Sequence, residues 1–209
     1  MPPILVCAKE DSTPIKVMRA SLLAYAPDVE LIIRPSSGAT FGESFNPALT
    51  ELFQTHDEII ISNDDVVLTP NTIPDLMHDI ANLQMIYGDK LGIVATYSDN
   101  IRSIQNIRDM GVGVLVGPKR ADRLSPVFAW MSKKAFTDCQ FPPLNWYADD
   151  VICEDLSALG YKHFVSRAYI HHVGSQTIGT DYRALNEASM PWLREHRPQY
   201  MQKWFGRPL

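Results

Sequence analysis

Short apolar runs rich in β-branched residues alternate along the chain with segments whose apolar residues repeat at helical spacing. The first pattern predicts buried strands, and the second predicts helices. Such alternation is typical of an α/β fold, a mostly parallel sheet with helices on its faces. The predicted strands cover residues 3–8, 29–33, 59–68, 91–96, 127–131 and 163–170, and the predicted helices cover residues 15–25, 43–54, 71–87 and 149–159.

Length and composition fit one folded domain. The chain has 209 residues, of which 45% are hydrophobic and 21% charged, enough for one substantial core. We find no internal repeat, low-complexity tract or linker, so we expect a single domain over residues 1–209. Residues 97–126 show no clear period, and we expect a hairpin and loops there.

The net charge and the cysteines indicate which classes of partner and which cellular compartment we expect for this protein. The net charge of −5 argues against general binding to nucleic-acid backbone. The three cysteines have no metal-binding spacing and fit a reducing compartment. The N-terminus lacks the basic and apolar parts of a signal peptide, and no apolar run approaches the roughly 18 to 20 residues that span a bilayer. We therefore expect a soluble cytoplasmic protein without a transmembrane segment.

A first acidic motif, Asn63, Asp64 and Asp65, ends the apolar run that starts at Ile59. Adjacent carboxylates at the end of a buried strand are costly to desolvate unless a cation meets them. A divalent ion that bridges to phosphate oxygens would meet that need. A polar turn explains the same three residues, because Asn and Asp favour turns. This segment alone does not decide between the two.

A second acidic motif, Asp149 and Asp150, stands at the start of a predicted helix. Free backbone N–H groups and the helix dipole favour a charged carboxylate there, and simple capping explains one of the two. The aromatic residues just before them, Trp146 and Tyr147, resemble the wall of a binding pocket. We expect Glu154, one turn further on, to be a surface charge.

Two adjacent histidines, His171 and His172, follow the last predicted strand. Alternate residues of an extended chain point to opposite faces, so these two side chains are unlikely partners for one ion. A histidine at a strand end is more often structural than a metal ligand. The distant acidic motif still needs further ligands, and either histidine could supply one.

Taken together, these motifs resemble the GT-A glycosyltransferases, and especially glycosyltransferase family 2. The resemblance covers most of the chain and includes the segments 63–65, 127–136, 149–161, 168–175 and 200–206. It implies a GT-A (Rossmann-like) mixed, mostly parallel sheet flanked by helices. It also implies that about residues 1–96 bind the nucleotide sugar and about residues 97–209 form the acceptor-binding and catalytic half.

The resemblance implies a metal-dependent, inverting transfer of a sugar from a nucleotide-sugar donor to an acceptor hydroxyl. It assigns Mn²⁺ or Mg²⁺ to Asp65 and His172, and the donor to Asn63 and Asp64. It makes Asp150 the catalytic base. The further residues that we assign on this basis are Asp149 in catalysis, Ala8, Lys9 and Arg34 in nucleotide binding, and Trp130, Trp146 and Tyr147 in acceptor binding.

The donor and acceptor are less defined. Family members usually carry an acidic base-binding stretch where this chain has residues 34–38, and the usual carboxylate is missing here, so the sequence does not define the donor nucleotide. A UDP-sugar is the first expectation, and GDP-sugars and others stay open. The basic residues Lys119, Arg120 and Arg123 are explained by a surface turn slightly better than by a loop that closes over phosphates. The acceptor could be a glycan, a protein or another molecule with a hydroxyl group.

Two other functions fit the same fold. A sugar nucleotidyltransferase usually has a glycine-rich loop after the first strand, and residues 9–12 contain no glycine. A non-catalytic domain that recognises a glycan or a partner is the second alternative. The presence of both Asp150 and His172 argues against lost activity.

Overall fold

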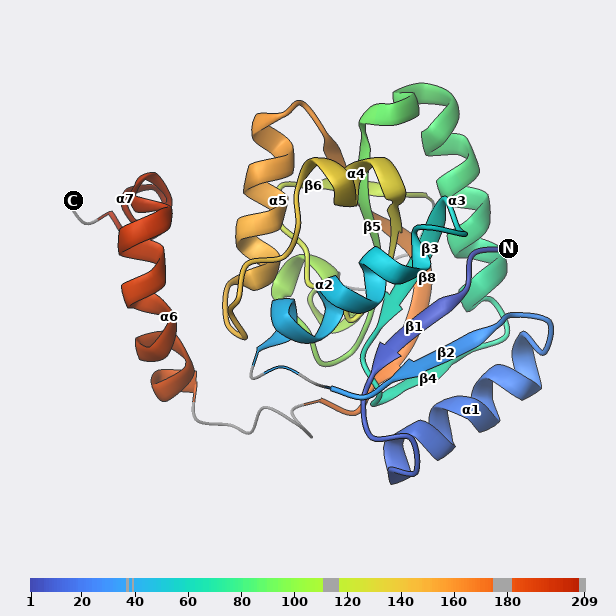
Figure 1. The fold of residues 1–209 in the computed structure, drawn as a ribbon. Helices are drawn as coiled ribbons and strands as arrows, with labels where there is room; N and C mark the ends of the chain where they lie inside the picture. The colour runs from blue at the N-terminus through green and yellow to red at the C-terminus, as the bar shows by residue number, and fades with distance from the viewer. Residues whose placement is uncertain (37, 39, 111–116, 175–181, 207–209) are drawn as a thin grey trace.

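The computed structural model describes residues 1–36, 38, 40–110, 117–174 and 182–206 (Figure 1). Its strands are β1 (Ile4–Cys7), β2 (Leu31–Arg34), β3 (Glu58–Ser62), β4 (Val66–Leu68), β5 (Leu91–Tyr97), β6 (Lys119–Ala121), β7 (Phe128–Ser132) and β8 (Lys162–His172). Its α-helices are α1 (Thr13–Tyr25), α2 (Phe41–Leu52), α3 (Thr72–Tyr87), α4 (Lys133–Asp138), α5 (Ala148–Ala158), α6 (Tyr182–His196) and α7 (Pro198–Phe205). Its short 3₁₀ helices are η1 (Gly88–Lys90), η2 (Ser103–Gln105) and η3 (Ile107–Met110).

The strands form a mixed sheet in the order β2-β1-β3-β7-β5-β8-β4, and β6 pairs with β8 off this path. Strands β1, β2, β3, β5 and β8 run in one direction, and β4, β6 and β7 run against them. Helix α1 connects the parallel neighbours β1 and β2, as a parallel pair requires. The predicted mostly parallel α/β sheet is therefore confirmed.

Two apolar layers sandwich the sheet. In β3, Ile59 and Ile61 pack with α2, α4 and α5, whereas Ile60 packs with α1 and α3. Successive residues of a strand point to opposite faces, so helices on both sides bury the whole run (Figure 1). This arrangement explains why the strands are continuously apolar instead of alternating with polar residues.

The carboxyl ends of the parallel strands meet at one edge of the sheet, where open α/β sheets bind ligands. Ala8 follows β1, Arg34 ends β2 and Asn63 follows β3. Strand β8 runs in the same direction and ends at His172. The motifs that lie far apart in the sequence therefore collect at this edge.

The stretch 59–68 forms two strands and not the single strand that we expected. Strand β3 ends at Ser62, and β4 pairs antiparallel with the end of β8, so that Val66 lies opposite His172. Strand β8 has 11 residues, enough to pair with β5 and then with β4. Residues 63–65 are thus the turn between two strands with different partners, which sets Asp65 beside the end of β8.

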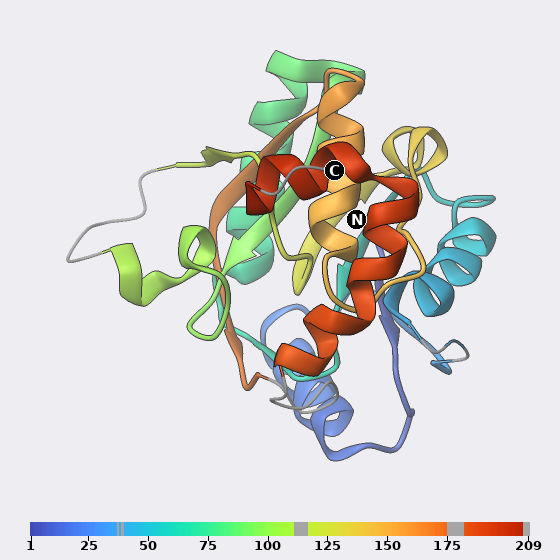
Figure 2. The same cartoon turned by 90° about the vertical axis from the view of Figure 1, so that its left-hand side faces the viewer.

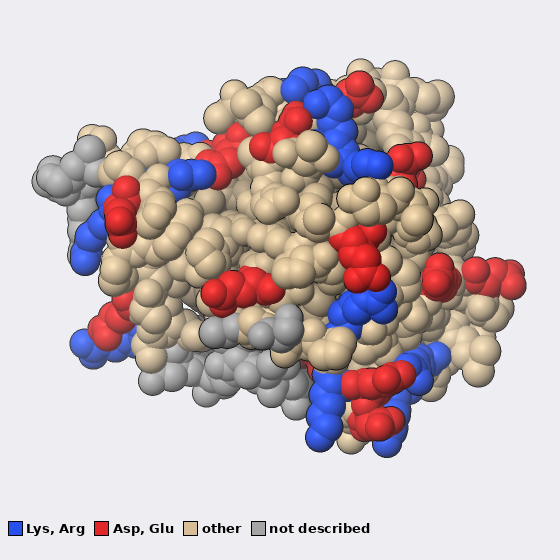
Figure 3. Space-filling view, viewed as in Figure 1, with Lys and Arg blue, Asp and Glu red and all other residues tan. Residues whose placement is uncertain are grey.

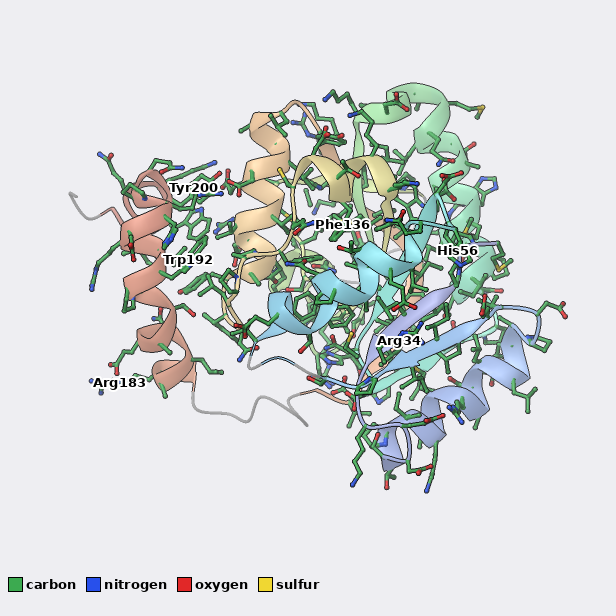
Figure 4. The ribbon with its side chains drawn as sticks, in the orientation of Figure 1. Arg34, His56, Phe136, Arg183, Trp192 and Tyr200 are labelled. Atoms are coloured by element: carbon green, nitrogen blue, oxygen red, sulfur yellow. The ribbon has the colours of Figure 1, made fainter. Side chains whose placement is uncertain are left out.

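Two C-terminal helices that the sequence pattern did not predict, α6 and α7, lie along the outer side of α5 (Figures 1 and 2). An apolar cluster joins Val151 of α5 to Leu193 of α6 and Met201 of α7. Tyr200 points from α7 toward α5 (Figure 4), and its hydroxyl donates a hydrogen bond to Asp155 at 2.6 Å. The helices are therefore fixed to α5 by both apolar and polar contacts.

Glu154 is buried, which corrects the expected surface charge. Its carboxylate accepts hydrogen bonds from Nζ of Lys203 at 2.7 Å and from the indole Nε1 of Trp204 at 3.2 Å. The Glu154 side chain is 9% exposed, and a buried carboxylate needs such partners. Its role is to hold α7 against α5.

The segment after β5 contains η2, η3 and β6. In its described part, β6 pairs with β8 and not with a neighbour in the local hairpin that we expected. Lys119 and Arg120 are exposed on this strand, so they do not belong to a loop. Residues 111–116 of the segment lie outside the described residues.

A buried carboxylate, Asp79, joins α3 to β8. It is fully buried and accepts hydrogen bonds from Oγ of Ser166 at 2.8 Å and from the backbone N–H of Arg167 at 2.8 Å. The guanidinium of Arg167 also donates to Asp79, from Nε at 2.9 Å and from Nη2 at 2.7 Å. All of these donors lose their partner if the carboxylate is removed.

We expect Asp79→Ala to lower the free energy of unfolding by about 3 kcal/mol, because it leaves buried donors unpaired. Equilibrium unfolding in urea measures this loss. His78→Ala, at an exposed position one residue earlier in α3, is the control and should change the free energy by less than about 0.5 kcal/mol. A loss below about 1 kcal/mol for Asp79→Ala would show that this contact does not hold α3 to β8.

Candidate active site

One half of the candidate site is a contact between the turn before β4 and the end of β8. The Nε2 atom of His172 lies 3.2 Å from Oδ1 of Asp65, and the two side chains are 10% and 5% exposed. The second oxygen of Asp65, Oδ2, accepts the backbone N–H of Gly174 at 3.1 Å. The structure thus brings together the two residues that the sequence assigned to one ion.

The segment after β5 fixes the orientation of the His172 ring. Its Nδ1 atom lies 2.7 Å from the backbone carbonyl oxygen of Asn100, which can only accept, so Nδ1 carries a proton. The side-chain amide of Asn100 donates to the carbonyl of His172 at 2.7 Å, and Asp99 accepts the backbone N–H of His172 at 3.0 Å. In the neutral ring, the lone pair is then on Nε2, the atom that faces Asp65.

The pKa values of the pair move in opposite directions. Burial raises the pKa of Asp65, but the hydrogen bond and the charge of His172 outweigh it and lower the pKa below its ordinary value. Burial lowers the pKa of His172, but the hydrogen bond and the charge of Asp65 outweigh it and raise the pKa. The carboxylate therefore attracts positive charge to Nε2, either as a proton or as a metal ion.

The structure also separates the two histidines. His171 is 49% exposed, and its Nδ1 lies 2.6 Å from Oδ2 of Asp99. His172 is buried on the opposite side of the strand, which confirms that the two side chains diverge. His172 is the histidine that meets Asp65, a choice that the sequence left open.

The other residues of the first acidic motif lie in the same turn. The backbone N–H of Asn63 donates to the carbonyl of Val127 at 2.9 Å, which ties the turn to the start of β7. Burial, and then the charge of Asp65, raise the pKa of Asp64. A cation or a hydroxyl group beside Asp64 would stabilise its carboxylate.

The residues expected at the nucleotide lie at the ends of β1 and β2. The backbone N–H of Ala8 donates to the carbonyl of Arg34 at 2.9 Å, and Lys9 is exposed in the following turn. The guanidinium of Arg34 (labelled in Figure 4) donates to Glu51 of α2 at 2.7 Å. The charge of Arg34 is thus engaged by a helix that borders the site.

The other half of the site is the pair Asp149 and Asp150 at the start of α5, held by Arg102. Arg102 donates from Nη2 to Oδ2 of Asp149 at 2.6 Å and from Nη1 to Oδ1 of Asp150 at 2.8 Å. The Ser125 hydroxyl donates to the same Oδ2 of Asp149 at 2.7 Å. Arg102 was not predicted from the sequence, because it lies in the segment without a clear hydrophobic period.

Burial and charge compete at this second pair. Burial raises the pKa of Asp149, and the charge of Arg102 opposes the rise. Burial alone would lower the pKa of Arg102, but the charge of Asp149 and the hydrogen bond with Asp150 raise it. Arg102 therefore stays cationic between the two carboxyl groups.

Helix α5 starts from a strained residue. Tyr147 precedes the helix with φ 69° and ψ 2°, in the left-handed region that a non-glycine residue rarely adopts, and it makes no side-chain cap. Within the described residues, the Oδ1 atom of Asp149 accepts the neighbouring backbone N–H of Asp150 at 3.0 Å. Simple capping, which explained one carboxylate at the sequence level, is therefore not the arrangement found.

A short segment after β5 connects the two halves. Asn100 holds the ring of His172, and Arg102, two residues later, holds Asp149 and Asp150. Two residues of extended chain span at most about 7 Å between their Cα atoms. Residues 99–102 therefore contact both acidic groups, His172 beside Asp65 on one side and the pair Asp149 and Asp150 on the other.

Comparison with known proteins gives a fold but no relative by sequence. No family model and no curated protein matches the sequence. Among solved structures, the chain resembles GalNAc-T7 with UDP, GalNAc and Mn²⁺ at a TM-score of 0.59 and 8% identity, over 82% of this chain and 43% of that one. It resembles S. aureus TarS 1–349 in complex with UDP-GlcNAc at a TM-score of 0.54 and 12% identity, over 85% of this chain and 60% of that one. It also resembles A197 from STIV at a TM-score of 0.50 and 12% identity, over 82% and 81%.

The fold is GT-A. The resemblance that the motifs indicated is thereby confirmed at the level of the fold. The chain spans less than two thirds of GalNAc-T7 and of TarS 1–349, at 43% and 60% of their lengths.

Within this GT-A fold, the three aromatic residues expected at the acceptor have different surroundings. Trp146 and Tyr147 are half-buried beside the acidic pair, and Tyr147 stacks on Trp204 of α7 with 5.7 Å between ring centroids. Trp130 is 1% exposed in the middle of β7, opposite Ile60 of β3. Its burial in the core does not support the expected contact with an acceptor.

Of the three basic residues at 119–123, only Arg123 contacts the site. Its Nη1 atom lies 3.5 Å from Oδ1 of Asp150, and its guanidinium stands over the ring of Trp204, 5.4 Å from the centroid. Arg123 therefore links the carboxylate pair to the C-terminal helices. Lys119 and Arg120 are exposed on strand β6.

The surface agrees with the modest net charge. On the face shown in Figure 3, acidic and basic side chains are interspersed, and no broad basic area is visible among the coloured residues. Among the helices in the described ranges, none combines the length and apolarity needed to cross a membrane.

Proposed function

We propose that this protein is a metal-dependent glycosyltransferase that moves a sugar from a nucleotide-sugar donor to an acceptor hydroxyl. The observation that carries this proposal is the connection of two acidic sites through residues 99–102. One site, Asp65 with His172, is suited to a diphosphate-bound ion, and the other, Asp149 with Asp150, is suited to a proton acceptor. The GT-A fold also supports the proposal of a glycosyltransferase.

The residues at the first site fit a divalent ion. An oxygen of Asp65 and the Nε2 atom of His172 converge, and the contact of Nδ1 with the Asn100 carbonyl sets the ring as in metal-binding histidines. Within the described residues, no group of three or more His, Cys, Asp or Glu side chains is placed to hold a metal. Diphosphate and water oxygens would complete the coordination, as is usual for Mg²⁺ and Mn²⁺. When bound, the ion would neutralise charge that develops on the leaving diphosphate.

The second site supplies the base. The acceptor hydroxyl gives its proton to Asp150 while its oxygen forms a bond to the anomeric carbon of the donor sugar. The bond from that carbon to the diphosphate breaks, and its electron pair stays on the leaving group. Attack opposite the leaving group inverts the anomeric configuration, which makes the reaction inverting.

The donor class is proposed from the same edge of the sheet. Ala8 and Lys9 follow β1, and Asn63 and Asp64 follow β3. These four residues would contact the nucleotide, for which a UDP-sugar is the first candidate. The two compared GT-A structures were determined with UDP, GalNAc and Mn²⁺ and with UDP-GlcNAc, which supports this choice. The acceptor is a glycan, a protein or another molecule that carries a hydroxyl group.

Incubation with a panel of UDP- and GDP-sugars and Mn²⁺ tests the proposal. We expect release of the nucleoside diphosphate from at least one sugar donor, by transfer or slow hydrolysis, and loss of release with EDTA. Pyrophosphate release from a nucleoside triphosphate and a sugar phosphate would instead indicate a nucleotidyltransferase. Binding of a glycan without turnover of any donor would indicate a binding module.

A further inference from the structure

Arg102 is held in a defined orientation in which three guanidinium nitrogens have partners. Besides its bonds to Asp149 and Asp150, its Nε donates to Oγ of Ser125 at 2.8 Å. The planar fork of an arginine can make these contacts together. A lysine retains the charge but is a point donor, so it cannot reproduce the same arrangement.

The buried side-chain amide of Gln105 holds Ser125, the residue that accepts the hydrogen bond from Nε of Arg102. Gln105 is 1% exposed, and its Oε1 accepts the backbone N–H of Ser125 at 2.7 Å. Its Nε2 donates to the carbonyls of Ser125 at 3.0 Å and Thr96 at 3.2 Å. Both hydrogens of the amide are used, so Ser125 and with it Arg102 are tied to the end of β5.

The two carboxylate oxygens of Asp150 differ in the length and number of their contacts with arginine side chains. Oδ1 lies 2.8 Å from Nη1 of Arg102 and 3.5 Å from Nη1 of Arg123. For Oδ2, the contacts among the described residues include only a long hydrogen bond from Arg102, at 3.4 Å. Oδ2 therefore keeps more capacity than Oδ1 to accept a further hydrogen bond from a hydroxyl group.

We propose that Arg102 is the positioning residue of the carboxylate pair: it holds Asp149 and Asp150 side by side and directs Oδ2 of Asp150 toward the acceptor. This inference rests on the proposed function. In the transfer step, the O–H bond of the acceptor breaks and its proton goes to Oδ2. An electron pair of the acceptor oxygen forms the bond to the anomeric carbon, and the electrons of the broken sugar–diphosphate bond leave with the nucleotide.

The charges around the pair support this role. Among the described residues, the titratable side chains that interact with the pair are those of Arg102, Arg123, Cys153 and Tyr147. Burial raises the pKa values of Cys153 and Tyr147, so these two stay neutral near pH 7. The positive charge therefore comes from Arg102 and from the more distant Arg123. When Arg102 is removed, mutual repulsion makes one of the two carboxylates keep its proton to higher pH.

The test uses Arg102→Gln and Arg102→Lys. We expect Arg102→Gln to lower kcat at pH 7 by about 10²-fold and to shift the acid limb of the kcat/KM profile to higher pH. Arg102→Lys keeps a cation, so the acid limb of its kcat/KM profile should stay near that of the wild type. Its kcat should still fall at least about tenfold, because lysine lacks the planar fork of arginine. The Kd for UDP with Mn²⁺, measured by calorimetry, should not change, because the first site is untouched. Arg19→Gln, an exposed arginine that pairs with Glu10, is the matched control.

A second readout does not depend on activity. In protein labelled with ¹³C at the aspartate carboxyl groups, NMR titration should show one carboxyl of the pair titrating at higher pH in Arg102→Gln than in the wild type. If the wild type turns over no nucleotide sugar, the proposed function fails, but this titration still decides the role of Arg102.

Identical titration and pH profiles in Arg102→Gln and the wild type would overturn the proposal. If Arg102→Gln does not fold, Arg102→Lys decides through two measurements. A lower kcat with unchanged UDP affinity supports the positioning role, and a wild-type kcat overturns it.

Discussion

Asp150→Asn is expected to lower kcat for sugar transfer by about 10² to 10⁴-fold, because an amide cannot accept the acceptor's proton at neutral pH. The asparagine keeps the shape of the side chain, and its carbonyl oxygen can still accept the hydrogen bond that Arg102 gives Oδ1 at 2.8 Å. The Kd for UDP with Mn²⁺ should therefore stay near the wild-type value. Initial rates with the best donor and calorimetry with UDP measure the two quantities separately.

Asp28→Asn, at an exposed position far from the acidic pairs in the sequence, is the control and should leave both quantities unchanged. Wild-type turnover in Asp150→Asn would remove Asp150 from the role of base. Weaker UDP binding in the same variant would mean that the change disturbs the donor half through residues 99–102.

Asp65→Ala is expected to weaken Mn²⁺-dependent binding of UDP by at least about 100-fold. The change removes one of the two side chains that converge on the proposed ion and leaves Nε2 of His172 without its partner at 3.2 Å. Calorimetry with Mn²⁺ and then with EDTA measures the loss. EDTA should bring the wild type to the affinity of the variant and should change the variant little.

Thermal unfolding of Asp65→Ala provides the control for folding, because the backbone N–H of Gly174 also loses its acceptor. Asp28→Ala should bind UDP as the wild type does and should respond to EDTA in the same way. An Asp65→Ala protein that is folded and binds UDP with unchanged, EDTA-sensitive affinity would contradict the assignment of the metal to this residue.

The pattern of apolar and polar residues was enough to predict an α/β sheet covered by helices on both faces. The run Ile59 to Ile61 is apolar on both alternating faces, and such a run is buried only where helices cover both sides of a sheet. The carboxyl ends of parallel strands lie at one edge, so the polar residues after β1 and β3 could be grouped from the sequence. The acidic motifs could be identified because a carboxylate beside a buried apolar run is costly to desolvate without a partner.

The contacts that unite the site were not predictable in the same way. Arg102 lies in a segment without periodicity, and nothing in its neighbours indicates that its guanidinium meets Asp149 and Asp150. Glu154 was assigned to the surface because helical spacing puts it off the apolar face of α5. The packing of α7, with Lys203 and Trp204 on this carboxylate, buries it instead.

The sequence by itself determined the alternation of strands and helices, the edge of the sheet at which we expect ligands, and the two acidic motifs. Only the tertiary structure decided that β4 pairs with the end of β8, so that Asp65 meets His172 and not His171. It also decided that residues 99–102 join this contact to the second acidic pair. The physical reason is that periodicity and turn chemistry act between neighbours in the chain, whereas strand register and ion pairing are fixed by the packing of segments far apart in sequence.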